Sequence, residues 1–128
     1  MSTPLTDDGL AIAAPNNDPR VVVYRVIDAA ELAHLRMTGS YGSNPNRSGK
    51  YFALTLAGAR AFAAAPMNTG STITETTLPQ SVVSQGWGMI DPRPHGAGSS
   101  VHFSELQLPI VYSAMIRPIV IIGAGQVP

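Results

Sequence analysis

An almost unbroken run of β-branched and apolar residues at positions 21–27 constrains the fold of this chain most strongly. A continuous apolar run of this length is typical of a buried strand. Asp28 follows it as a helix N-cap, and Glu31 three residues later completes a capping-box pattern. Gly39 supplies the C-terminal stop. The ordered part of the chain is therefore expected to begin with a strand followed directly by a short helix.

The remaining pattern predicts more strands than helices. A second, alanine-rich helix is expected over residues 56–65, with Thr55 as its N-cap and Pro66 after its end. Residues 86–100 are rich in glycine and proline and are expected to form turns. Because strands outnumber helices and the helices come early, the pattern favours an α+β fold over a doubly wound α/β sheet. The further strand candidates are residues 51–54, 71–78, 101–105, 111–112 and 119–122, the last of which is expected to close the core.

The length of 128 residues is typical of one domain. Residues 1–20 are expected to form a flexible N-terminal arm, because prolines stand there among Ser, Thr, Asn and Asp. The folded domain is expected over residues 21–128. The arm lacks the basic start and apolar run of a classical signal peptide. No stretch approaches the roughly 18 apolar residues that a membrane span needs, so no membrane association is expected.

The charge composition narrows the possible partners. Only 12% of residues are charged, and eight acidic residues balance eight basic ones. A net charge of zero argues against charge-driven binding to nucleic acid or to anionic lipid. The chain has no cysteine, which excludes disulfides, thiolate metal sites and a cysteine nucleophile. The three histidines lack the spacing of metal ligands, so no metal is expected.

Two charged residues stand in apolar segments, where an unpaired charge is costly. Arg25 lies in the first apolar run and is a candidate for binding a phosphate or carboxylate through bidentate hydrogen bonds from its planar guanidinium. The alternative is an arginine at a strand end that is solvated or paired with Asp28. Glu105 lies between Phe103 and an apolar stretch, and carboxylates held in such places cluster at functional sites. The alternative is an outward-facing residue on a half-solvated strand.

The adjacent aromatic pair Tyr51–Phe52 is a candidate wall for a flat ligand ring. Core packing is the alternative use for both rings. Because side chains alternate along a strand, one ring is expected in the core and the other is expected to point away from it.

Five short segments carry a resemblance to a known family. The sequence over residues 21–122 resembles the ADP-ribosyltransferase-like domains at the C-termini of bacterial polymorphic toxins, including those on Rhs-type carriers. In chain order the segments are 23–26 (VYRV), 30–32 (AEL), 38–39 (TG), 49–53 (GKYFA) and 59–62 (ARAF). The later segments 76–79 (TTLP) and 100–105 (SVHFSE) fit the same layout.

The resemblance implies a split, twisted β-sandwich around an NAD-binding cleft, with short helices packed early in the chain. It implies that Arg25 contacts the dinucleotide and that Tyr51, Phe52 and Thr55 brace the nicotinamide ring and its ribose. It also implies that Glu105, on a late strand, stabilises the oxocarbenium-like transition state. NAD is then a substrate, and no metal takes part.

The implied function is that of a toxin or effector that cleaves NAD and transfers ADP-ribose to a macromolecule, with protein as the expected acceptor. Such a domain is secreted or delivered, acts in the cytoplasm of a target cell and is paired with a cognate immunity protein. Hydrolysis of NAD without transfer remains an alternative. Two other classes stay open, a small ribonuclease toxin that uses His95 and His102, and a non-catalytic protein-binding module.

Overall fold

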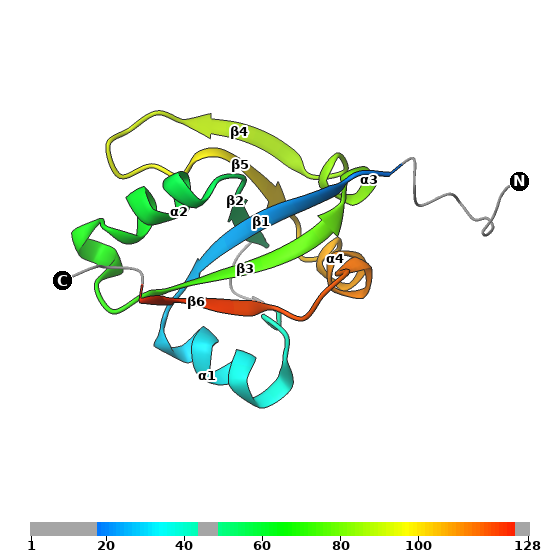
Figure 1. The fold of residues 1–128 in the computed structure, drawn as a ribbon, viewed down its shortest axis with the longest axis horizontal. Coiled ribbons are helices and arrows are strands. Elements are labelled where there is room, and N and C mark those ends of the chain that lie inside the picture. Colours follow the sequence, from blue (N-terminus) through cyan, green and yellow to red (C-terminus); the bar gives the residue numbers. More distant parts are fainter. Residues whose placement is uncertain (1–17, 44–48, 125–128) are drawn as a thin grey trace, which may run out of the picture.

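A computed structural model describes residues 18–43 and 49–124 of the chain. Most of the expected N-terminal arm, residues 1–17, lies outside the described residues. The described part holds one six-stranded antiparallel sheet in the order β4-β5-β2-β1-β3-β6, with short helices around it (Figure 1). The predicted α+β class is confirmed. The strands are β1 (Arg20–Ile27), β2 (Lys50–Ala53), β3 (Thr72–Pro79), β4 (Trp87–Asp91), β5 (Gly98–Phe103) and β6 (Val120–Ala124).

Helices cover both faces of this sheet. Residues of α1, α3 and α4 share the larger buried cluster with β1, β2 and β5, whereas α2 packs with Ala53 and Ile73 in a second, smaller cluster. Along β1 the side chains alternate accordingly, because Val23 and Ile27 belong to the first cluster while Tyr24 packs against the second. The helices are α1 (Ala29–Thr38), α2 (Leu56–Ala63), α3 (Gln80–Val83) and α4 (Leu108–Ala114), with a 3₁₀ turn, η2 (Pro66–Asn68).

The sheet is nearly divided between β1 and β2. Strands β1 and β3 pair along their whole length, from Arg20–Pro79 to Ile27–Thr72. Between β1 and β2 the only register pair in the described residues is Tyr24 with Ala53. The sheet therefore consists of two three-stranded halves, β4-β5-β2 and β1-β3-β6, joined at a narrow seam.

Helix α1 forms for the local reasons that the sequence indicates. The Asp28 side chain accepts a hydrogen bond from the Glu31 backbone N–H at 2.8 Å, and Gly39 ends the helix with a positive φ of 77°. Only this half of the expected capping box is found among the described residues, because the Glu31 carboxylate turns toward Arg25 instead. The same residue thus begins a helix and contributes to the site described below.

Several boundary predictions are wrong. Residues 86–100, expected as turns, contain β4 and the beginning of β5, and residues 111–112, expected as a strand, lie in helix α4. The latter also shows that the helices do not all come early. Glu105, expected on a strand, follows β5 in the turn that leads into α4. Strand β6 does not close the core but lies at the sheet edge, with its valine and both of its isoleucines exposed.

Candidate active site

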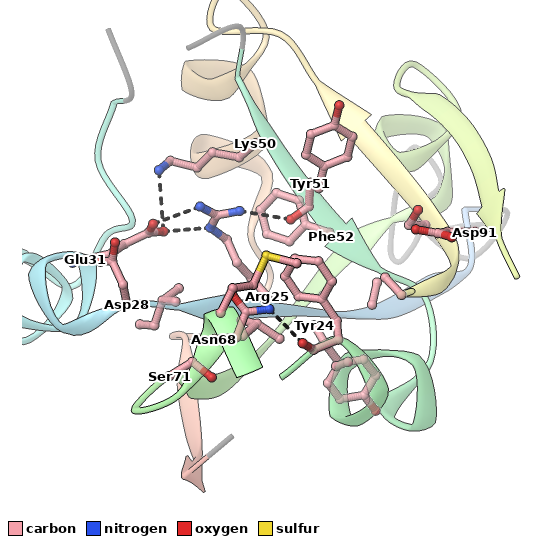
Figure 2. Close-up of a pocket in the computed structure, with 18 of the residues that line it drawn as sticks. Tyr24, Arg25, Asp28, Glu31, Lys50, Tyr51, Phe52, Asn68, Ser71 and Asp91 are labelled. Carbon is pink, nitrogen blue, oxygen red and sulfur yellow. Dashed lines mark hydrogen bonds and ion pairs between the residues drawn. The ribbon is translucent and has the colours of Figure 1, made fainter. Parts of the chain in front are cut away.

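A cavity of about 800 Å³ extends across the seam between the two halves of the sheet (Figure 2). This volume lies within the range of small-molecule sites. Strands β1, β2, β4 and β5, the start of α1, helix α2 and the segment from η2 to β3 all contribute lining residues. The charged side chains among them are Arg25, Asp28, Glu31, Lys50, Asp91 and Arg93, and the ring-bearing ones are Tyr24, Tyr51, Phe52, Phe62 and His102.

One wall of the cavity is built from an ion-pair cluster of Arg25, Glu31 and Lys50. Arg25 Nε donates to Glu31 Oε2 at 2.6 Å and a terminal nitrogen of Arg25 donates to Oε1 at 2.8 Å, so the contact is bidentate. Lys50 Nζ lies 3.4 Å from Glu31 Oε2. The three side chains are 14%, 13% and 3% exposed for Arg25, Glu31 and Lys50. Two cations share one carboxylate within this cluster, and Asp28 adds a second carboxylate to the same side of the lining, so these four side chains together carry no net charge.

Arg25 also spans the seam, where the two halves of the sheet have little other backbone pairing. Its Nη1 donates to the backbone carbonyl of Tyr51 at 3.0 Å. The guanidinium carbon lies 5.9 Å from the centroid of the Tyr41 ring and 6.0 Å from that of Phe52. These bonds use three of the five N–H groups of a guanidinium. The partner of Arg25 is therefore Glu31 and not Asp28, and Arg25 is held in place by its neighbours.

Lys50 is a buried ammonium with an altered affinity for its proton. Burial lowers the pKa of Lys50, and the nearby positive charge of Arg25 lowers it further. The negative charges of Glu31 and Glu105 oppose this shift. The Lys50 ammonium contributes positive charge to this wall, but burial removes the water that would stabilise its charged form.

The aromatic pair on β2 divides between core and cavity as predicted. Phe52 is completely buried, and its ring meets the rings of Tyr41 and Phe103 edge-on at centroid distances of 5.6 and 5.9 Å. Tyr51 is 54% exposed, and its ring lies 4.5 Å from the His102 ring, centroid to centroid. Phe52 therefore anchors β2 in the core while Tyr51 offers a ring face at the cavity.

His102 lines the cavity, although the sequence suggests a role for it only in the alternative ribonuclease. On β5 it pairs in register with Tyr51 of β2 on one side and with Trp87 of β4 on the other, so the three side chains share one face of the sheet. The alternation of apolar and polar side chains along β5 indicates which way His102 points, because Val101 and Phe103 on either side of it are buried. A polar residue between two buried apolar ones points to the opposite face.

Asp91 and Arg93 form a second ion pair in the cavity lining. Arg93 Nε donates to Oδ1 of Asp91 at 2.8 Å, and its second contact, to Oδ2, is 2.6 Å. Hydrogen bonds from the Arg93 side chain and backbone lower the pKa of Asp91. The Arg93 side chain is 77% exposed, so this pair is hydrated and opens at little cost.

Two predicted site residues lie outside the cavity lining. Thr55 Oγ1 accepts a hydrogen bond from the Gly58 backbone N–H at 2.9 Å and caps helix α2, as the sequence predicts. Glu105 lies in the turn after β5, where its charge opposes the lowering of the Lys50 pKa by burial and adds to the raising of the Tyr112 pKa by burial. The structure thus brings Arg25, Tyr51 and Phe52 together at one cavity and leaves Thr55 and Glu105 outside the residues that line it.

Within residues 18–43 and 49–124, no group of three or more His, Cys, Asp or Glu side chains is arranged to hold a metal ion. In the same part of the chain, no helix is long and apolar enough to cross a membrane. No protein-family model, curated protein or solved structure matches the chain.

Proposed function

We propose that this protein is an NAD-consuming enzyme that cleaves the bond between nicotinamide and ribose and transfers ADP-ribose to a macromolecular acceptor. The observation that carries the proposal is the cavity at the seam, where Arg25 of β1 bonds to the backbone of Tyr51 on β2. The division of the sheet into two halves at this cavity is the feature that supports a fold of the ADP-ribosyltransferase type, although the two halves belong to one sheet and are not stacked as a sandwich. Hydrolysis is the competing reaction, in which water replaces the acceptor.

The lining chemistry suits a dinucleotide. Arg25 and Lys50 place two cations side by side at the cavity, and two N–H groups of Arg25 have no hydrogen bond among the described residues, so they can donate to a pyrophosphate oxygen. The exposed face of Tyr51 offers a stacking surface for a heteroaromatic ring. Binding both groups fixes the reacting ribose between them, and such positioning supplies much of the rate in transfer reactions.

Breaking the glycosidic bond leaves positive charge on the ribose, which a carboxylate in the cavity stabilises. Glu31 is already neutralised by Arg25 and Lys50. Asp91 lines the opposite half of the site on β4, and its ion-pair partner among the residues that the structure describes is the exposed Arg93. We therefore assign the charge-stabilising role to Asp91, in place of the role that the resemblance implies for Glu105.

The test is nicotinamide release from NAD by the purified protein, followed by chromatography, with and without cell extract. Release that falls when Tyr51 is changed to Ala and persists when the exposed His34 on α1 is changed to Ala is the expected result. Labelled NAD then separates the two reactions, because transfer labels a macromolecule while hydrolysis yields free ADP-ribose. No nicotinamide release in either condition would contradict the proposal.

In this proposal the chain is the active domain of a toxin or effector. It acts in the cytoplasm of a target cell on a protein acceptor and is restrained by a cognate immunity protein. Expression in a bacterial cytoplasm should then arrest growth and lower the NAD pool, and Tyr51→Ala should relieve both effects.

A ribonuclease is the second candidate, because the cavity gathers an imidazole and two cations that suit RNA cleavage. His102 would take the proton of the ribose hydroxyl, and Arg25 with Lys50 would face the phosphate. Incubation of the protein with RNA, and separately with NAD, distinguishes the two candidate functions. Fragmented RNA together with unchanged NAD would favour this candidate over the first.

A further inference from the structure

His102 differs from the charged side chains of the cavity in having no hydrogen-bond partner among the described residues. Arg25 and Lys50 are bound to Glu31, and Asp91 is bound to Arg93. Asp28, which also lines the cavity, accepts the bond that caps α1. Both ring nitrogens of His102 are thus available to a bound molecule.

The surroundings of His102 hold the ring and leave space beside it. Its ring lies against that of Tyr51 at 4.5 Å, which restricts its orientation. The lining residues two positions further along the same face are small, Ser100 on β5 and Ala53 on β2, and they pair with each other. Ser100 and Ala53 are themselves buried, so a bound molecule approaches the imidazole from the cavity that all three residues line.

We propose that His102 is the general base of the transfer step and that the acceptor presents a hydroxyl group or is water. This inference rests on the proposed cleavage of NAD. The bond between ribose C1′ and the nicotinamide nitrogen breaks, and nicotinamide leaves with the bonding electron pair. The hydroxyl oxygen bonds to C1′, its proton passes to an unbound ring nitrogen of His102, and the imidazolium then returns that proton to solvent.

The acceptor class is narrowed by what a base is needed for. A carboxylate acceptor carries no proton and needs no base, whereas a neutral hydroxyl or water oxygen is a weak nucleophile that must lose its proton when it attacks. Glu31 is unsuited to take that proton because two cations neutralise it, and Lys50 is held as its counter-ion. An imidazole is the side chain that most often performs this transfer near neutral pH.

The test compares His102→Gln and His102→Ala with the unchanged protein. General base catalysis contributes about a hundredfold or more. We expect kcat for nicotinamide release to fall by that factor in both variants, with KM for NAD nearly unchanged. Imidazole added to His102→Ala should restore the rate in proportion to its concentration. Methanol supplied as a hydroxyl acceptor should give methyl ADP-ribose with the unchanged protein and far less with His102→Gln.

The matched control is His34→Ala, which removes an exposed imidazole that is not among the cavity-lining residues and should keep full activity. Thermal melting of both His102 variants establishes that they are folded. Equal release by His102→Gln and the unchanged protein rejects the role of His102 alone. So does a loss that appears as a raised KM and that imidazole fails to restore. Absence of release from the unchanged protein rejects the proposed function itself, which is a distinct result.

Discussion

Arg25 of β1 and Glu31 of α1 form a bidentate ion pair, with Arg25 Nε 2.6 Å from Glu31 Oε2 and the second contact at 2.8 Å. The pair ties the strand to the helix that follows it. Because Arg25 also donates to the Tyr51 carbonyl, the same guanidinium connects the two halves of the sheet. The residue proposed to bind the pyrophosphate is therefore also part of the structural link across the cavity.

Glu31→Gln should destabilise the fold strongly. The change leaves Arg25 and Lys50 close together and largely buried with no counter-charge from Glu31. Removing one partner from a buried ion pair costs about 3 kcal/mol of unfolding free energy. In urea unfolding, this loss of free energy appears as a lower midpoint concentration of urea with an unchanged m-value. Asp91→Asn, whose partner Arg93 is exposed, is the control and should leave the midpoint almost unchanged; equal losses in both variants would contradict this account.

Asp91→Asn should lower the rate of NAD cleavage about a hundredfold, since it removes the negative charge assigned to stabilising the ribose cation. Glu105→Gln is the matched comparison, because it removes a carboxylate that lies outside the cavity lining, and it should keep most of the activity. Nicotinamide release measured for both variants decides between the two acids. Loss of activity in Glu105→Gln alone would restore the role that the resemblance implies for Glu105.

The protein should lose stability as the pH rises above 10. Burial raises the pKa of both Tyr41 and Tyr112 above the ordinary value of 10.0. The folded state then keeps phenol protons that the unfolded chain releases. Their contribution to stability is complete below pH 10 and declines above it. Lys50 acts in the opposite sense, because its pKa is lowered and its contribution grows as the pH approaches its ordinary value of 10.5.

Thermal melting between pH 8 and pH 11 isolates the tyrosines when the unchanged protein is compared with Tyr41→Phe/Tyr112→Phe. The double variant loses the hydrogen bond between the Tyr41 hydroxyl and Thr74, so it should start from a lower melting temperature. Its melting temperature should then fall less steeply with pH. Parallel curves for the two proteins would show that these phenols do not cause the alkaline loss.

Gly49→Ala should disrupt the pairing of β2 with β5. Gly49 has a φ of +104°, and an added Cβ would lie 1.9 Å from the backbone oxygen of Phe103. Backbone cannot move out of the way as a flexible side chain can, so strand ends must separate. Gly39→Ala is the control, because it has a positive φ but nothing within 4 Å, and it should cost only about 1 kcal/mol. A similar fall in melting temperature for both would contradict the steric argument.

The parts of the fold that could be predicted are those fixed by local signals. The end of β1, helix α1 and the capping of α2 follow from Asp28, Gly39 and Thr55, whose side chains or backbone act within a few residues. The sequence does not indicate strand β4, because glycines and prolines surround Trp87 and Ile90, and it does not indicate α4, because Val111 and Tyr112 have β-propensity. Tertiary packing overrides such weak preferences.

Local sequence patterns likewise indicate some residues of the candidate site but not others. Arg25 and the Tyr51–Phe52 pair could be selected because each is an anomaly within its own segment. His102 and Asp91 join them only because β5 pairs with β2, and β4 with β5. That strand order depends on contacts between segments distant in sequence, so no local pattern indicates it. Glu31 was assigned to helix capping for the same reason, since its partner Arg25 is reached through the fold.

Tyr51→Ala should raise KM for NAD about tenfold and leave the fold intact. The ring is half exposed, so its loss removes little packing, and the backbone carbonyl that holds Arg25 stays in place. Stacking between aromatic rings contributes about 1 kcal/mol, to which the apolar contact of the ring adds, and 1.4 kcal/mol corresponds to a factor of ten. Tyr51→Phe keeps the ring and removes only the hydroxyl, so it should retain the original KM. Nicotinamide release measured over a range of NAD concentrations gives KM for all three proteins. A common value would mean that the dinucleotide does not stack on Tyr51, whereas a rise in both variants would mean that the hydroxyl, and not the ring face, makes the contact.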